Sequence, residues 1–137
     1  MTPHQLWLFL PLGYLVTILI ETPVLLVGLS ARHPLGRRLF AGAWLSACTY
    51  PVVVLVLPPL LLGPNGERGL YLLVAETFAP VAECLLFLAA FGGPAAGTWR
   101  ATVRDCAAVT IANLLSFSTG ELLYAFGAGE WLNSLLG

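Results

Sequence analysis

The stretch LLVAETFAPVAECLLFLAAF (residues 72–91) is long enough to cross a bilayer as an α-helix, which needs about 20 apolar residues. It nevertheless contains two glutamates, Glu76 and Glu83, and a proline, Pro80. A carboxylate at the centre of a membrane helix costs about 2.5–3.5 kcal/mol on insertion scales. The stretch therefore predicts a membrane helix whose glutamates face protein or water, or are protonated.

The composition places the whole chain in a membrane. Of its 137 residues, 58% are hydrophobic and 9% are charged, whereas soluble domains carry about 25% charged residues. The basic residues are six arginines, and the net charge of -1 provides no basic stripe that could follow phosphates. We therefore expect the lipid bilayer as a partner and no nucleic acid.

Four apolar runs reach the length of a membrane span, at about 5–29, 39–62, 69–92 and 104–127. The remaining tail, 128–137, is too short to span, and we expect it to lie along the membrane surface. Pro23, Pro51 and Pro80 fall inside the runs and predict kinked helices. The chain is thus predicted to be all-α, a polytopic integral membrane four-helix bundle forming one domain, 1–137.

The arginines predict the orientation. Five of the six lie in or next to the first and third loops, and one lies in the middle loop beside Glu67. Loops rich in arginine stay in the cytoplasm, so both termini are predicted to lie outside. Because arginine is the only basic type beside abundant Ala, Leu and Gly, we expect a GC-rich bacterium and its plasma (inner) membrane.

Counting residues from the centre of each span predicts two polar layers. Glu21, Glu83 and Asn113 fall at one depth on the cytoplasmic side of centre, and Glu76 and Glu121 fall at one depth on the outer side. Seven residues are two helical turns, so Glu76 and Glu83 share a face about 10 Å apart along the axis. The predicted ion-binding or transport residues are Glu21, Thr49, Tyr50, Glu76, Glu83, Asn113, Ser116 and Glu121.

Simpler structural roles exist for each of these groups. Prolines in membrane helices are often packing kinks, and small hydroxylated residues such as Ser46 and Thr49 let helices approach closely. Asn113 is equally an interhelical clamp or a site residue. A buried protonated carboxyl bonded to Asn or Tyr is the structural alternative for any single glutamate, but four in so short a chain favour a function.

Three further expectations concern the surroundings of these residues. The segments ETPV (21–24) and ETFAPV (76–81) suggest a duplicated two-helix unit related by an axis along the membrane normal. Arg104 and Asp105 are predicted to pair at the membrane interface, where Asp105 suits a helix N-terminus. No arginine is predicted to lie within the membrane, so none would neutralise the carboxylates.

Motifs for other chemistries are missing from the sequence. Neither GxSxG, HExxH, a P-loop nor a dinucleotide fingerprint occurs, and the three cysteines lack zinc-type spacing. The two histidines, His4 and His33, are predicted to lie at the membrane edges, where they cannot hold a haem inside the bundle. We expect no cofactor and no enzymatic activity, although a carboxylate pair acting with Cys84 or Cys106 is an alternative of lower weight.

The order of the motifs resembles a group of small uncharacterised four-helix bacterial membrane proteins. In that group Glu-x-Pro ends the first helix, Thr-His-Pro lies in the second, two glutamates seven apart lie in the third, and Ala-Asn followed by Ser and Gly marks the fourth. The corresponding residues here are Glu21 and Pro23, Thr49-Tyr50-Pro51, Glu76 and Glu83, and Ala112-Asn113, Ser116 and Gly120. Tyr50 replaces the histidine of the pattern. The resemblance supports the choice of positions and implies no particular function.

Two functions of different classes follow. The first is proton- or cation-coupled transport or cation conduction, because a carboxyl in an apolar environment favours its neutral form and can exchange a proton for a cation. Four helices barely enclose a path, so we expect a homo-oligomer. The alternative is an accessory or assembly subunit of a larger membrane complex, whose polar stripes contact partner helices.

Overall fold

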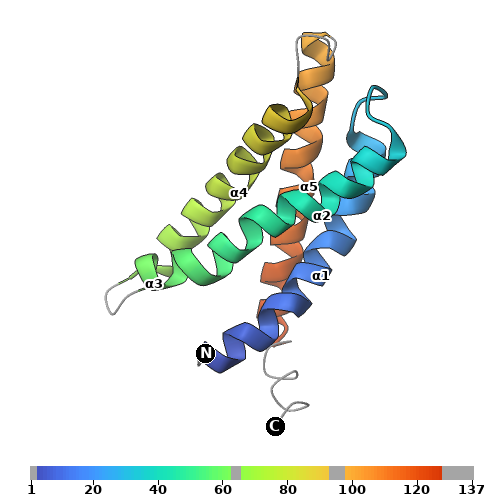
Figure 1. Ribbon diagram of the computed structural model, residues 1–137. Helices are drawn as coiled ribbons and strands as arrows, with labels where there is room; N and C mark the ends of the chain where they lie inside the picture. The colour runs from blue at the N-terminus through green and yellow to red at the C-terminus, as the bar shows by residue number, and fades with distance from the viewer. Residues whose placement is uncertain (1–2, 63–65, 93–97, 128–137) are drawn as a thin grey trace.

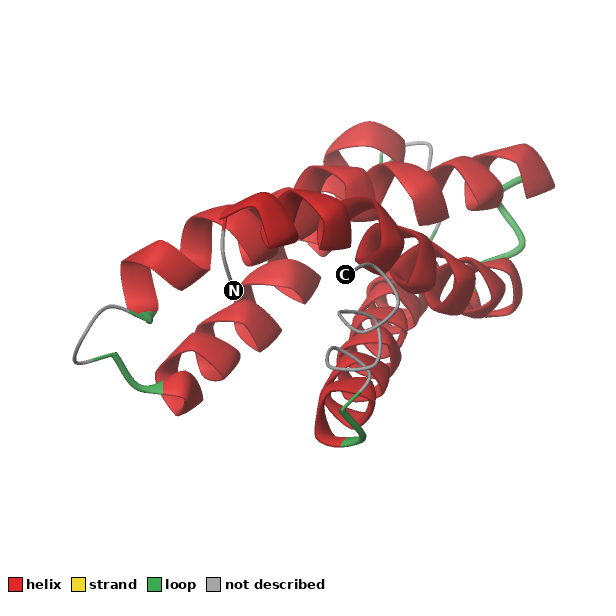
Figure 2. Cartoon of the chain, turned by 90° about the horizontal axis from the view of Figure 1, so that it is seen from below, coloured by secondary structure: helices red, strands yellow, loops and turns green. Residues whose placement is uncertain are grey.

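The computed structural model describes residues 3–62, 66–92 and 98–127, and this part of the chain is helical with short connections (Figures 1 and 2). The elements are α1 (Pro3–Gly28), α2 (Leu35–Pro51), the π-helical segment η1 (Val52–Val56), α3 (Leu57–Leu61), α4 (Arg68–Phe91) and α5 (Trp99–Ala125). The second run is continuous from Leu35 to Leu61, so four helices are long and apolar enough to span a membrane. The all-α prediction is confirmed for these residues, and the predicted surface tail lies outside them.

Two helices begin earlier than predicted. α2 begins at Leu35 and α5 at Trp99, although their arginines suggested loop. The arginines of these early turns lie near the end of α1, and the last carbonyls of a helix have no partner within it. Arg38 of α2 donates to the carbonyls of Leu26, Ser30 and His33, and Arg104 of α5 donates to that of Gly28 at 2.8 Å. Arg38 in the first turn of α2 and Arg104 in the second turn of α5 thus bind carbonyls at and just beyond the end of α1.

The helices form two hairpins that pack as a bundle (Figure 1). α1 packs on α2 and α5, and α4 packs on α5 and α2. α1 and α4 therefore occupy opposite corners, with α2 and α5 between them. A group on α1 and a group on α4 can meet only through side chains of the two intervening helices.

The two ends of the bundle differ in how closely the helices pack. The arginine-rich end, which contains the 29–34 connection, holds a buried apolar core made of Leu25, Leu29, Ala41, Leu45, Phe87, Ala108, Val109 and Ala112. At the terminal end, where α1 begins and α5 ends, α3 and α4 diverge from α1 and α5 (Figure 1). This divergence leaves space between the α3–α4 pair and the α1–α5 pair at the terminal end.

The prolines affect the helices unequally. α1 continues as an α-helix through Pro23, and α4 continues through Pro80. After Pro51 the hydrogen bonding changes to the π-helical pattern over Val52–Val56, before α3 resumes the α pattern. Proline lacks an amide hydrogen and disturbs the bonding of the preceding turn, and η1 is the turn that precedes Pro58 and Pro59.

Candidate functional site

Glu21 lies in a polar pocket formed by three helices. Its carboxyl is 2% exposed, in the second half of α1. Ser46 of α2 donates to one carboxyl oxygen at 2.6 Å, and Ser116 of α5 donates to the other at 2.7 Å. Both oxygens of Glu21 are thus satisfied by hydroxyl groups from the two neighbouring helices.

Glu83 of α4 has an equivalent environment. It is also 2% exposed, and it accepts hydrogen bonds from Thr49 of α2 and from the Asn113 amide of α5, both at 2.6 Å. Glu21 and Glu83 line the same cavity. The predicted inner layer therefore exists as two adjacent carboxyl pockets, each of them using one donor from α2 and one from α5.

The two pockets repeat the same arrangement. Ser46 and Thr49 are three residues apart on α2, as are Asn113 and Ser116 on α5, and within each pair the first residue bonds the glutamate of its own hairpin. The second residue bonds the glutamate of the other hairpin. Positions at matching intervals are buried or half-buried in both helices: Ala41, Gly42, Leu45, Ser46 and Thr49 in α2, and Ala108, Val109, Ala112, Asn113 and Ser116 in α5.

This repeat corrects the predicted one in its register. The two Glu-Thr segments suggested that Glu21 corresponds to Glu76, whereas the hydrogen bonds make Glu21 correspond to Glu83. Short letter matches are weak evidence, because a repeat is maintained by the contacts it makes. The spacing shared by Ser46 and Thr49 with Asn113 and Ser116 was the signal that could have found it, and it would have added Ser46 to the predicted site.

Each of the three hydroxyl donors has a second acceptor within reach. The hydroxyl of Ser46 is 3.0 Å from the Gly42 carbonyl, that of Thr49 is 3.2 Å from the Leu45 carbonyl, and that of Ser116 is 3.0 Å from the Asn113 carbonyl. A hydroxyl has one hydrogen to donate and two lone pairs that accept. Each can donate to an ionised carboxylate, or accept from a protonated carboxyl while donating to its backbone carbonyl. The pockets can therefore satisfy both protonation states without moving a helix.

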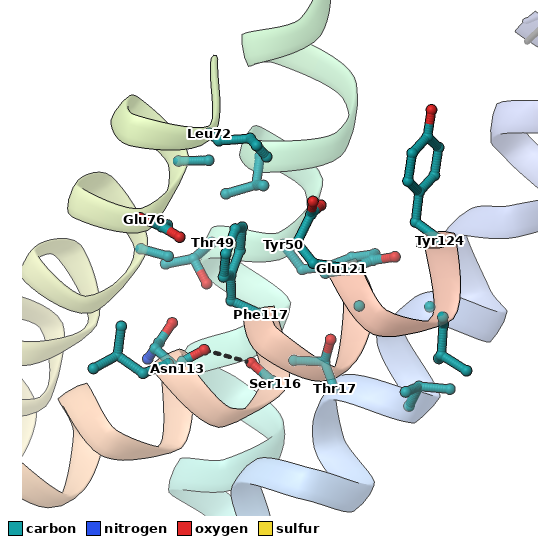
Figure 3. Close-up of a pocket in the computed structure, with 18 of the residues that line it drawn as sticks. Thr17, Thr49, Tyr50, Leu72, Glu76, Asn113, Ser116, Phe117, Glu121 and Tyr124 are labelled. Carbon is teal, nitrogen blue, oxygen red and sulfur yellow. Dashed lines mark hydrogen bonds between the residues drawn. The ribbon is translucent and has the colours of Figure 1, made fainter. Parts of the chain in front are cut away.

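A cavity of about 920 Å³ lies beside the two carboxyls, on the side of the terminal end (Figure 3). All eight predicted site residues line it, together with apolar side chains from α1, η1, α4 and α5. Tyr50 lies next to Tyr14, with 6.1 Å between ring centroids, and its hydroxyl occupies the space that a side chain at Gly13 would need. The structure thus collects the predicted residues around one space, with Glu21 and Glu83 at its buried end.

The two predicted outer glutamates differ from each other. Glu76 is half-buried on α4, and Figure 3 shows its carboxyl directed into the space that Thr49 and Phe117 also face. Among the described residues no hydrogen bond or ion pair satisfies this carboxyl. Glu76 is the carboxylate that remains open to the cavity.

Glu121 is neutralised by an arginine, contrary to prediction. Arg68 at the start of α4 forms a bidentate pair with Glu121 of α5, at 2.8 and 3.0 Å, and its guanidinium lies 4.3 Å from the ring centroid of Tyr124. The prediction was wrong because Arg68 was assigned to the middle loop. The Arg68 side chain instead reaches from the first turn of α4 to the last turns of α5.

A second polar cluster occupies the arginine-rich end. Asp105 is 0% exposed and accepts hydrogen bonds from the Ser30 backbone amide at 2.6 Å, from Arg32 at 2.6 Å and from the ring of His33 at 2.9 Å. The predicted pair of Arg104 with Asp105 is wrong, because neighbours in sequence point to different sides of a helix. His33, expected at the membrane edge, is 2% exposed beneath the Phe87 ring.

Metal binding has no support from the arrangement of ligands. In the described ranges no group of three or more His, Cys, Asp or Glu side chains could hold a metal ion. Comparison with other proteins adds no assignment: no family model, curated protein or solved structure matches this chain.

Proposed function

We propose that this chain is a four-span membrane protein that carries out proton-coupled transport of a cation, with Glu21 and Glu83 as the proton-binding groups. The observation that carries the proposal is the pairing of each carboxyl with hydroxyl groups that have alternative acceptors. A carboxyl bonded only to fixed donors would hold one charge state. Here the hydroxyl groups of Ser46, Thr49 and Ser116 can rotate, so that each donates to an ionised carboxylate or accepts from a protonated carboxyl.

The cavity supports a route to these groups from one side. It reaches Glu21 and Glu83 from the terminal end, while Leu25, Leu29, Leu45 and Phe87 pack beneath them toward the arginine-rich end. Transport then requires a second arrangement in which that core separates and the terminal end closes. Parallel repeats that rock about a central site give such alternation in other transporters, and the two equivalent hairpins have this symmetry.

The membrane setting completes the proposal. The four apolar helices insert in the plasma (inner) membrane of a bacterium, with the arginine-rich end in the cytoplasm and both termini outside. The helices bend at their prolines, and η1 after Pro51 is a hinge in the second span. Every group of the two pockets comes from one chain, so each chain of a homo-oligomer carries its own site.

Proton movement in liposomes tests this function. The purified protein is reconstituted with a pH-sensitive dye inside, and single cations are added outside, including alkali metal ions, ammonium and tetraphenylphosphonium. We expect at least one to drive proton movement across the membrane. Glu83→Gln and Glu21→Gln should abolish it, since an amide cannot release a proton, whereas Glu67→Gln, at the exposed start of α4, should leave it unchanged.

The controls separate this function from the alternative. Each variant must elute as a monodisperse species and keep its helical circular dichroism. If no cation moves protons through folded protein, or if both glutamine variants remain active, the proposed function is wrong. Inactivity together with a membrane protein that co-purifies at fixed stoichiometry would establish the accessory role instead.

A further inference from the structure

Resting on the proposed function, we propose that the cavity binds a monovalent organic cation with an apolar body, and that Glu76 is the carboxylate that pairs with its charge. The size of the cavity is the first argument. Its volume of about 920 Å³ falls in the range of small-molecule sites, about 300–1,000 Å³. A dehydrated metal ion needs only a shell of oxygen ligands, which occupies a small part of this space.

The walls give the second argument. Most of the lining side chains are apolar, among them Leu12, Val16, Val53, Leu72, Phe117 and Leu123. Such walls supply no oxygen ligands to a metal ion, and they bury the apolar surface of an organic molecule at about 25 cal/mol per Å². The chemistry of the walls therefore selects an apolar body.

The charges define the sign and the valence of the ligand. Of the four glutamates that line the cavity, Glu21 and Glu83 are satisfied by neutral donors, and Glu121 is paired with Arg68. Glu76 remains without a partner among the described residues, half-buried and directed into the cavity (Figure 3). One open carboxylate matches one positive charge.

Aromatic rings complete the site. Tyr50, Tyr71, Phe117 and Tyr124 line the cavity, and the faces of such rings attract organic cations. The protein already shows this contact at the cavity edge, where the Arg68 guanidinium lies over the Tyr124 ring and beside the Glu121 carboxylate. A carboxylate together with an aromatic face is the recognition that a lipophilic ammonium or phosphonium group uses.

Equilibrium binding of tetraphenylphosphonium to the purified chain tests the inference independently of transport. We expect binding that Glu76→Gln weakens by at least about tenfold, because the counter-charge is lost in an apolar site. Glu76→Asp should retain most of the affinity, and Glu67→Gln all of it. The neutral triphenylphosphine oxide should bind at least about tenfold more weakly than the cation, and sodium should not compete.

The outcomes separate this inference from the proposed function. Equal affinity for the neutral compound, or no effect of Glu76→Gln, overturns the cation site. Absence of tetraphenylphosphonium binding overturns it as well, even if another cation moves protons in liposomes. Binding that depends on Glu76, in protein that moves no protons, supports the cation site and contradicts proton-coupled transport.

Discussion

Each end of the bundle has an ion pair between an arginine and a carboxylate, and the two pairs differ in burial. At the arginine-rich end Arg32 contacts Asp105 at 2.6 Å, with side chains 17% and 0% exposed. At the terminal end Arg68 contacts Glu121 at 2.8 Å, with side chains 47% and 34% exposed. The first pair is enclosed by the packed loop and α5, and the second lies at the edge of an open cavity.

The difference shows what each end contributes. A buried carboxylate with several donors ties the connection between α1 and α2 to α5, because separating them leaves charges without partners in an apolar environment. An exposed ion pair contributes little to stability, so separating its two groups costs little free energy. Rigidity is thus concentrated at one end, and space for a ligand at the other. Three tests of this contrast follow, one of them a pair of substitutions.

The largest effect is expected from Asp105→Ala. It leaves Arg32 and His33 without their acceptor in a buried site, which costs about 3–5 kcal/mol in the free energy of unfolding. Denaturation of the purified protein in detergent, followed by circular dichroism, measures this loss. Glu67→Ala removes an exposed carboxylate and should change the free energy by less than about 0.5 kcal/mol. A similarly small effect of Asp105→Ala would show that this end is not the rigid one.

Two glycine-to-alanine substitutions, one at each end, should change the free energy of unfolding by intermediate amounts and in opposite directions. In Gly28→Ala the new Cβ would lie 2.8 Å from the Cβ of Ala108, and the overpacking should cost about 1–3 kcal/mol. Gly120→Ala adds a methyl group where no atom lies within 4 Å.

Alanine is the better helix former, so Gly120→Ala should stabilise the protein by about 0.5–1 kcal/mol. The same detergent denaturation measures both variants, and the difference in sign is the comparison of interest. If Gly120→Ala destabilises as much as Gly28→Ala, the terminal end is packed as tightly as the arginine-rich end.

The smallest effect is expected from Arg68→Gln. Breaking the partly exposed pair with Glu121 should cost about 0.2–1 kcal/mol in unfolding free energy. Arg100→Gln, at another exposed arginine outside this pair, is the control for removing a positive charge. A loss for Arg68→Gln as large as that for Asp105→Ala would remove the distinction between the two ends.

The sequence by itself determined the helices and the identity of the polar residues. The length of the apolar runs and the small charged fraction predict helices long enough to span a membrane, because a helix satisfies its own backbone hydrogen bonds without water. Residue counting at 1.5 Å per residue predicted a common depth for Glu21, Glu83 and Asn113. Distance along a helix is a local property, so the sequence could group these three, and the structure places all of them around one cavity.

Only the tertiary structure decided which groups meet. The bonds of Ser46 and Ser116 to Glu21, of Arg68 to Glu121 and of Asp105 to the α1–α2 connection depend on the rotation of each helix and on the angles between the helices. Side-chain packing between helices sets both of these, and residue spacing within one helix carries no information about that packing. Whether a buried carboxyl is satisfied, paired or open to a cavity is therefore a property of the assembled bundle.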